Sequence, residues 1–315
     1  MAASAALRPE VATLLDHLRA QRFSGAEQLL EALATANARD DEGRNIFHQV
    51  TAEAREEMIK PEEEAVWLVR LNLWCDRSPE SYAPFLMRGY FYVGYAWEAR
   101  GTSWGANVPG AAWKLFEDRL AQAEADLRRA HTLAPKLAGA LRELMVVARG
   151  RSEPEMLERW FTEGVAAQPD NMDLYFERLE SLKAKWGGSH EAMFAFARRA
   201  VLEHPDDPMF GLLVVNSHLE LANRTDSTHH KKYFVQPKVW QEVRELLERI
   251  LAKYPRSFRN HNRMALYAFY GEDYARSRQE FEAVGDHWEP DVWVTQDYFK
   301  CIRDDVMKRT QHAVP

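Results

Sequence analysis

Three features of the sequence combine residue types that could do chemistry. The stretch "GTSWG", residues 101–105, spells G-x-S-x-G, the pattern that carries the attacking serine of α/β-hydrolases. The stretch "THHKKYF", residues 228–234, holds two histidines, two lysines and two aromatic residues. Two acidic runs, "ARDDEG" and "KPEEEAVW", carry carboxylates that could bind a divalent cation or perform acid-base work. Each candidate depends on the elements that would position it.

Helical periodicity argues against a hydrolase. A nucleophile elbow needs a strand before the serine, a helix after it, and a parallel sheet whose loops supply an acid and a histidine. The preceding segment "RGYFYVGYAWEAR" continues a helical run, and the sequence shows no alternation of strands and helices. We therefore expect "GTSWG" to be a glycine-rich turn between helices, with Ser103 not catalytic.

The other two features have plainer explanations as well. Adjacent histidines such as His229 and His230 point in different directions unless a loop bends them together, and no third ligand follows at helical spacing. Both acidic runs precede expected helices, where negative charge is favoured beside the exposed amides of the first turn. The H-E-x-x-H, G-x-G-x-x-G and P-loop patterns are missing. The sequence thus predicts no catalytic residue, no metal and no cofactor.

Composition narrows the class of protein. The 315 residues are 46% hydrophobic, and 41 basic residues against 48 acidic ones give a net charge of −7. This balance disfavours a general nucleic-acid binder. Neither Cys75 nor Cys301 belongs to a C-x-x-C pair or a Cys/His cluster, so we expect no disulfide framework and no zinc site, and no window approaches a membrane span. We expect a cytoplasmic protein with neither nucleic-acid nor membrane partners.

Prolines that follow expected helices recur with a period. Their spacings are 34, 36, 50 and 35 residues, for Pro135, Pro169, Pro205, Pro255 and Pro290. A period near 34 is typical of tetratricopeptide repeats, whose second helix is closed by a proline that cannot continue it. The longest gap indicates an insertion near 222–237.

The expected fold class is therefore all-α, a tetratricopeptide-like helix-pair solenoid. The repeats are degenerate, because Arg178 and His218 occupy positions that are usually apolar. We assign the repeats to residues 121–315 and a helical N-terminal cap to residues 1–120, because terminal units must hide their apolar face.

Three phrases resemble an uncharacterised bacterial domain family with a tetratricopeptide-like second half. They are "SPESYAPFLMRGYFYVGYAWEARG" (78–101), "FEDRLAQAEADLRRAHTLAP" (116–135) and "KWGGSHEAMFAFAR" (185–198). The resemblance covers roughly residues 60 to 205. It implies a bacterial source and a helical architecture, and it implies no activity.

Polar residues on the first helix of each pair form the expected binding surface, because these helices line the concave wall of a solenoid. The predicted partner-binding residues are Arg142, Arg149, Asp173, Glu180, Lys183, Asn216, Glu220, Arg259 and Asn262, joined by His229, His230 and Tyr233 of the insertion. The alternatives are an ordinary solvated groove and a surface insertion without a role.

We expect a non-enzymatic protein-binding scaffold, such as an immunity protein or a chaperone that binds a toxin or effector. The net negative charge favours a basic protein partner, because complementary potentials speed encounter. The alternative is an enzyme or a small-ligand binder on a helical scaffold.

Overall fold

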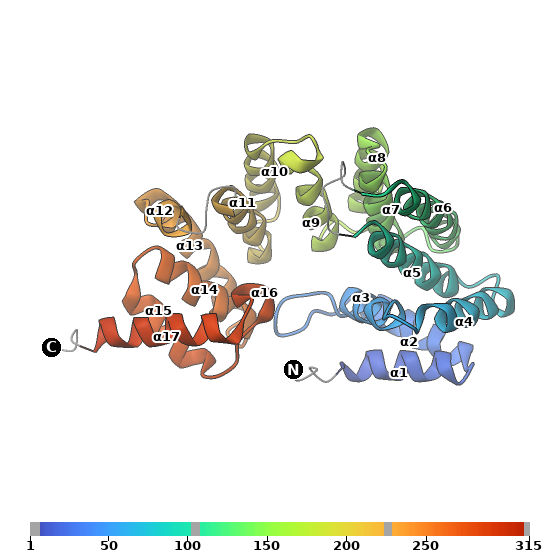
Figure 1. Cartoon of the computed structure of the whole chain (residues 1–315), viewed down its shortest axis with the longest axis horizontal. Coiled ribbons are helices and arrows are strands. Elements are labelled where there is room, and N and C mark those ends of the chain that lie inside the picture. Colours follow the sequence, from blue (N-terminus) through green and yellow to red (C-terminus); the bar gives the residue numbers. More distant parts are fainter. Residues whose placement is uncertain (1–6, 102–107, 224–228, 312–315) are drawn as a thin grey trace. The chain divides into compact units, whose positions relative to one another are not determined.

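The computed structural model is helical throughout its described parts, which are residues 7–101, 108–223 and 229–311 (Figure 1). Within these ranges the one pairing of extended backbone is an isolated antiparallel bridge between Arg39 and Asn45. None of the described helices combines the length and apolar character needed to cross a bilayer. The all-α prediction is therefore confirmed.

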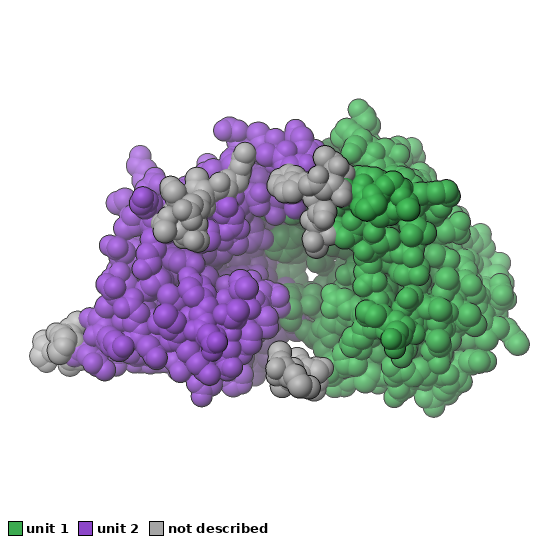
Figure 2. Space-filling view, viewed as in Figure 1, with its two compact units in different colours: residues 1–39, 44–181 green, residues 40–43, 182–315 purple. Residues whose placement is uncertain are grey.

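The chain divides into two compact units (Figure 2). Unit 1 consists of residues 1–39 and 44–181, and unit 2 consists of residues 40–43 and 182–315. The boundary expected near residue 120 falls inside a helix, α6 (Gly110–Leu133), so the chain continues without a break there.

Unit 1 contains nine described helices. In chain order they are α1 (Pro9–Arg19), α2 (Phe23–Ala36), α3 (Ile46–Met58), α4 (Glu64–Arg77), α5 (Tyr82–Arg100), α6, α7 (Ala138–Gly150), α8 (Pro154–Ala167) and α9 (Met172–Ser181). Sequence neighbours pack together, with α5 on α6 and α7 on α8. Helices two apart along the chain also meet, since α3 contacts α5, α5 contacts α7, and α7 contacts α9. The helices α3, α5, α7 and α9 therefore form one contiguous row.

The α5–α6 contact combines close backbone approach with a buried ion pair. A Cβ atom at Gly89 would lie 2.6 Å from Cγ of Leu127, so only glycine fits at this spacing without movement. At the adjacent positions, the Arg88 guanidinium donates to both carboxylate oxygens of Asp126 at 2.7 Å. This bidentate geometry fixes the register of the two helices.

Unit 2 contains the remaining described helices. They are α10 (His190–Glu203), α11 (Gly211–Asn223), α12 (His229–Phe234), α13 (Pro237–Lys253), α14 (Phe258–Tyr270), α15 (Tyr274–Val284), α16 (Pro290–Trp293) and α17 (Gln296–Thr310), with short 3-10 turns at Ala184–Trp186 and Pro208–Phe210. Its most extensive contact joins α14 to α15, and α11 packs on both α10 and α13.

Four of the five periodic prolines follow helix ends as expected. The helices α6, α8, α10 and α13 each end two residues before a proline, at Leu133, Ala167, Glu203 and Lys253. Pro290 departs from the pattern, because it begins α16 instead. Proline is favoured at that place, since its missing N–H would have no partner in the first turn.

The region predicted as an insertion is partly built into unit 2. Its residues 229–234 form α12, and Phe234 at the end of that helix is fully buried. The Phe234 ring lies 5.0 Å from the ring of Tyr267 and 5.9 Å from the ring of Tyr270, both on α14. The expectation of a surface insertion is thus wrong for Phe234.

We predict that Phe234→Ala lowers the free energy of unfolding by about 3–5 kcal/mol, because it removes a large buried ring and leaves a cavity. The adjacent Val235 is 39% exposed, so Val235→Ala should cost less than about 0.5 kcal/mol and serves as the control. Urea unfolding followed by circular dichroism measures both changes. If Phe234→Ala and Val235→Ala both lower the free energy of unfolding by the same small amount, α12 does not contribute to the core.

Candidate functional site

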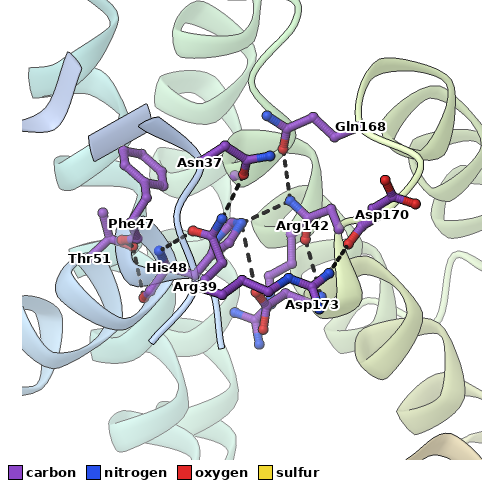
Figure 3. A network of polar contacts seen from close by, with 12 residues as sticks. Asn37, Arg39, Phe47, His48, Thr51, Arg142, Gln168, Asp170 and Asp173 are labelled. Carbon is purple, nitrogen blue, oxygen red and sulfur yellow. Dashed lines mark hydrogen bonds and ion pairs between the residues drawn. The ribbon is translucent and has the colours of Figure 1, made fainter. Parts of the chain in front are cut away.

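The most extensive polar network of unit 1 lies along the row of α3, α5, α7 and α9. We call it the α7 cluster and define it by its residues, which are His48, Arg55, Arg142, Glu143, Arg149, Asn171, Asp173 and Glu177. Figure 3 shows part of it, with His48, Arg142 and Asp173 labelled among their neighbours. Its members come from α3, α7 and α9 and the turn before α9, so the fold joins segments far apart in sequence.

Helical spacing explains why α7 and α9 face each other with opposite charges. Arg142 and Arg149 are seven residues apart and therefore share a face of α7, while Asp173 and Glu177 are four apart on α9. The Arg149 Nε donates to Glu177 Oε1 at 2.6 Å, and Arg142 Nη2 lies 3.8 Å from Glu177 Oε2. Both arginines of α7 thus meet at Glu177 of α9.

Glu143 is the most deeply buried member of the cluster. Its carboxylate has no exposed surface and pairs with Arg142 through Oε1, while Arg55 Nη1 lies 3.9 Å from that oxygen. The second oxygen, Oε2, has no hydrogen-bond partner among the described residues. The carboxylates Glu143 and Glu177 raise the pKa of Arg142 against the opposing effect of burial. Two guanidinium groups thus stabilise this buried charge.

His48 begins the cluster on α3. Asn45 caps this helix, its side-chain oxygen accepting from the His48 N–H at 3.2 Å. The His48 Nε2 lies 2.9 Å from Asn171 Nδ2 and 3.7 Å from the Asp173 carboxylate. Because an amide Nδ2 only donates, Nε2 accepts and the ring proton sits on Nδ1. Burial lowers the pKa of His48, so the ring is neutral at pH 7.

The cluster is balanced in charge and only partly accessible. Three guanidinium groups, of Arg55, Arg142 and Arg149, face three carboxylates. The side chains of Arg142 and Asp173 are 29% and 32% exposed, whereas that of His48 is 8% exposed. The described residues contain no group of three histidine, cysteine or carboxylate side chains arranged to hold a metal ion. The cluster can therefore offer fixed donors and acceptors at its edge.

The structure brings three of the predicted binding residues together, namely Arg142, Arg149 and Asp173. Lys183 and Glu220 form a separate ion pair of 3.0 Å in unit 2. Arg259 pairs with Asp291 at 2.6 Å, and Glu180 and Asn216 are half-buried. Asn262 was expected at the surface, but it is fully buried and its Oδ1 accepts from the Trp293 indole. Asn262 is therefore part of the core.

The insertion residues hold α12 against α11. His230 Nε2 lies 2.7 Å from Asn223 Oδ1, and the Tyr233 hydroxyl lies 2.7 Å from Nδ1 of His218. His218 also contacts Glu242 through Nε2 at 2.9 Å. His229 begins α12, and its side chain lies outside the described residues.

The hydrolase-like pattern can be followed only to its first residue. The helix expected before it is present, since α5 runs to Arg100 and ends at Gly101 with a φ of +67°. Glycine adopts this positive φ without steric cost. Ser103 lies outside the described residues.

Sequence reasoning missed five members of the cluster, which are His48, Arg55, Glu143, Asn171 and Glu177. Helical periodicity alone places Glu143 off the apolar stripe of its helix, but α7 is buried nearly all round. A glutamate among the buried residues of a helix that packs on four others, α5, α6, α8 and α9, needs a partner. The need of a buried carboxylate for a counter-charge would therefore have identified Glu143 as paired, once α7 was known to pack at the centre of the unit.

Comparisons with known proteins place this region within a family. The model of the family described as "Domain of unknown function (DUF4034)" matches residues 10–173. The matched range starts at residue 10, whereas the resemblance inferred from the three phrases starts near residue 60. The phrase at 185–198 lies outside the matched range. A comparison with curated proteins finds no match. Of the α7 cluster, all members except Glu177 fall inside the matched residues.

We predict that Arg142→Met costs about 3 kcal/mol of unfolding free energy, because it leaves the buried Glu143 carboxylate without its closest counter-charge. The double variant Arg142→Met/Glu143→Leu should be less destabilised than the single one, with a coupling of about 1–3 kcal/mol. Denaturant unfolding of the full cycle measures this. If the losses of unfolding free energy in the two single variants add up to the loss in the double variant, Arg142 and Glu143 do not form a stabilising pair. Arg199→Met breaks only an exposed ion pair with Glu203 and should cost less than about 1 kcal/mol.

A second prediction concerns pH. The unfolded pKa of histidine is 6.5, and the folded pKa of His48 is lower. Between these values the unfolded chain binds more protons, so His48 makes stability fall as the pH drops below 6.5, by at most about 1.4 kcal/mol per pH unit. His48→Gln should therefore lose less stability than the wild type between pH 7 and pH 5 in urea titrations. Identical pH profiles would show that His48 is not held neutral.

Proposed function

Because this chain belongs to the DUF4034 family, we propose its function from the geometry of its helices: it is a non-enzymatic scaffold that binds a protein partner through unit 1. The observation that carries the proposal is the α7 cluster. It presents fixed charged groups at the edge of the row of α3, α5, α7 and α9. The partner-contacting groups are Arg142 and Asp173, with Glu180 further along α9.

Preorganisation is the physical reason this arrangement suits binding. An exposed arginine loses side-chain freedom when it contacts a partner, and this loss weakens the complex. Ion pairs with Glu143 and Glu177 already restrict Arg142, so less freedom remains to be lost. A guanidinium beside a carboxylate also offers donors for the C=O groups of a peptide and acceptors for its N–H groups.

Binding explains the cluster better than catalysis does. The imidazole of His48 is the side chain of the cluster that would be considered first as a general base, but its Nε2 accepts a hydrogen bond from Asn171. The carboxylates of Glu143 and Glu177 are engaged by arginines and almost entirely buried. A general base must reach the proton that it abstracts.

We also propose that the helix pairs form tetratricopeptide-like repeats. This assignment is supported by helix pairs such as α7–α8 and α14–α15 and by the helix ends that precede Pro135, Pro169, Pro205 and Pro255. In such repeats the first helices form the binding wall. In unit 1 these would be α3, α5, α7 and α9, the helices that contact one another in a row.

The proposed partner is a basic protein of the same bacterial cytoplasm, such as a toxin that this chain would neutralise or an effector that it would hold. The net charge of −7 supports a basic partner, because opposite potentials accelerate encounter.

Capture of partners by the tagged chain from a lysate of its source organism tests this proposal. We expect one predominant protein, which Asp173→Asn binds about tenfold more weakly, as the loss of one interfacial charge implies. Asp118→Asn is the matched control, because Asp118 is 60% exposed and pairs only with Lys114 on its own helix. It should leave the affinity unchanged.

Two outcomes would contradict the proposal. Equal affinities of Asp173→Asn and Asp118→Asn would remove the α7 cluster from the interface. Failure to capture any protein would favour the small-ligand alternative.

A further inference from the structure

One face of α14 in unit 2 carries hydrogen-bond donors that the protein leaves unused. Arg259, Arg263 and Tyr267 follow at intervals of four residues and so share this face. Asn260 lies beside them, its Oδ1 accepting from Arg263 Nη1 at 2.7 Å. We propose that Arg263, Asn260 and Tyr267 form a binding site for an oxyanion, the group shared by carboxylates and phosphates.

Arg263 is the cation at the centre of this site. Among the described residues no carboxylate forms an ion pair with its guanidinium, whose one hydrogen bond goes to Asn260. Burial lowers the pKa of Arg263, although the side chain is only half-buried. A desolvated positive charge that still reaches solvent attracts an anion more strongly than a fully hydrated one.

Asn260 provides a second and independent observation. The residue is fully buried, and its Nδ2 has no hydrogen-bond partner in the described part of the chain. The contact from Arg263 fixes which end of the amide is the oxygen, so the free NH₂ group lies beside the guanidinium. A buried donor without an acceptor is unfavourable, and an anion would relieve this cost.

Tyr267 adds a third donor one turn beyond Arg263. Its hydroxyl likewise has no hydrogen-bond partner among the residues described. The unused capacity at this place therefore includes the N–H groups of Arg263 and Asn260, which only an acceptor can satisfy, and the Tyr267 hydroxyl, which can donate to one. A carboxylate or phosphate offers two or more oxygens that match the planar fork of a guanidinium.

The neighbouring carboxylates are already occupied. Glu42 accepts from Ser257 Oγ at 2.5 Å and from the Arg259 N–H at 3.2 Å, where it caps the first turn of α14. Asp291 pairs with Arg259 at 2.6 Å, and Glu289 lies 3.7 Å from the same guanidinium. Arg259 is thus paired. Glu42 and Asp291 act on Arg263 through their charge but without ion-pair contact, which leaves the Arg263 guanidinium available for direct contact with an external anion.

Thermal unfolding in the presence of two probe anions tests the site. Sodium phosphate and sodium acetate are each compared with sodium chloride at equal ionic strength. Because a ligand that binds only the folded state raises the unfolding temperature, at least one probe should raise the midpoint of the wild type more than that of Arg263→Gln. The comparison between variants removes general salt effects on protein hydration. A larger shift with phosphate assigns the site to phosphorylated ligands, and a larger shift with acetate assigns it to carboxylates.

Further variants separate binding from folding. Arg199→Gln removes an exposed arginine of α10 and should keep the wild-type response. If Arg263→Gln does not unfold cooperatively, Arg263→Lys and Tyr267→Phe replace it. Each should need about tenfold more anion for the same shift, because one directed contact is lost. Equal responses of the wild type and the Arg263 and Tyr267 variants, or no response to either anion, would overturn the proposal.

Discussion

The compensation of one buried carboxylate, that of Glu143, is the constraint on which unit 1 depends. A charge without exposed surface is tolerated only beside an opposite charge, so Arg142 and Arg55 must lie where they do. Arg142 then reaches Glu177, which Arg149 also contacts, and this connects α7 to α9. Because α7 packs on α5, α6, α8 and α9, an adjustment around Glu143 would be felt through most of the unit. The polar edge that we propose for binding is therefore fixed from inside.

Local features of the fold could be predicted from the sequence, because they depend on neighbouring residues. Proline cannot continue a helix, so the ends of α6, α8, α10 and α13 follow from the residues themselves. The apolar positions Leu141, Leu144, Met145 and Ala148 are all buried, as their spacing predicts. The α7 cluster depends instead on contacts between distant segments, such as His48 with Asn171, which are 123 residues apart. Periodicity places charged residues toward solvent, and it therefore misplaced Glu143.

The insertion shows a different limit of pattern reasoning. Polar composition predicts a surface segment, and most residues at 222–237 are polar. Helix α12 has six residues, too few for periodicity to mark its buried side. Phe234 is nevertheless placed between aromatic rings of α14, and Lys231 lies 4.1 Å from the ring centroid of Phe269. Aromatic residues in an otherwise polar insertion are the signal that such a segment packs on the core.

The two polar regions differ in the balance of their groups, and this difference separates their roles. In the α7 cluster guanidinium and carboxylate groups are equal in number, so the network is stable without a ligand and presents a fixed surface. On α14 the unused groups include the buried NH₂ of Asn260 and the Arg263 guanidinium, which no carboxylate of the described residues contacts in an ion pair. A balanced network gains little from an added ion, because each charge already has a partner. The unpaired NH₂ of Asn260 would instead gain an acceptor from a bound anion, so we expect an anion to stabilise unit 2 through α14.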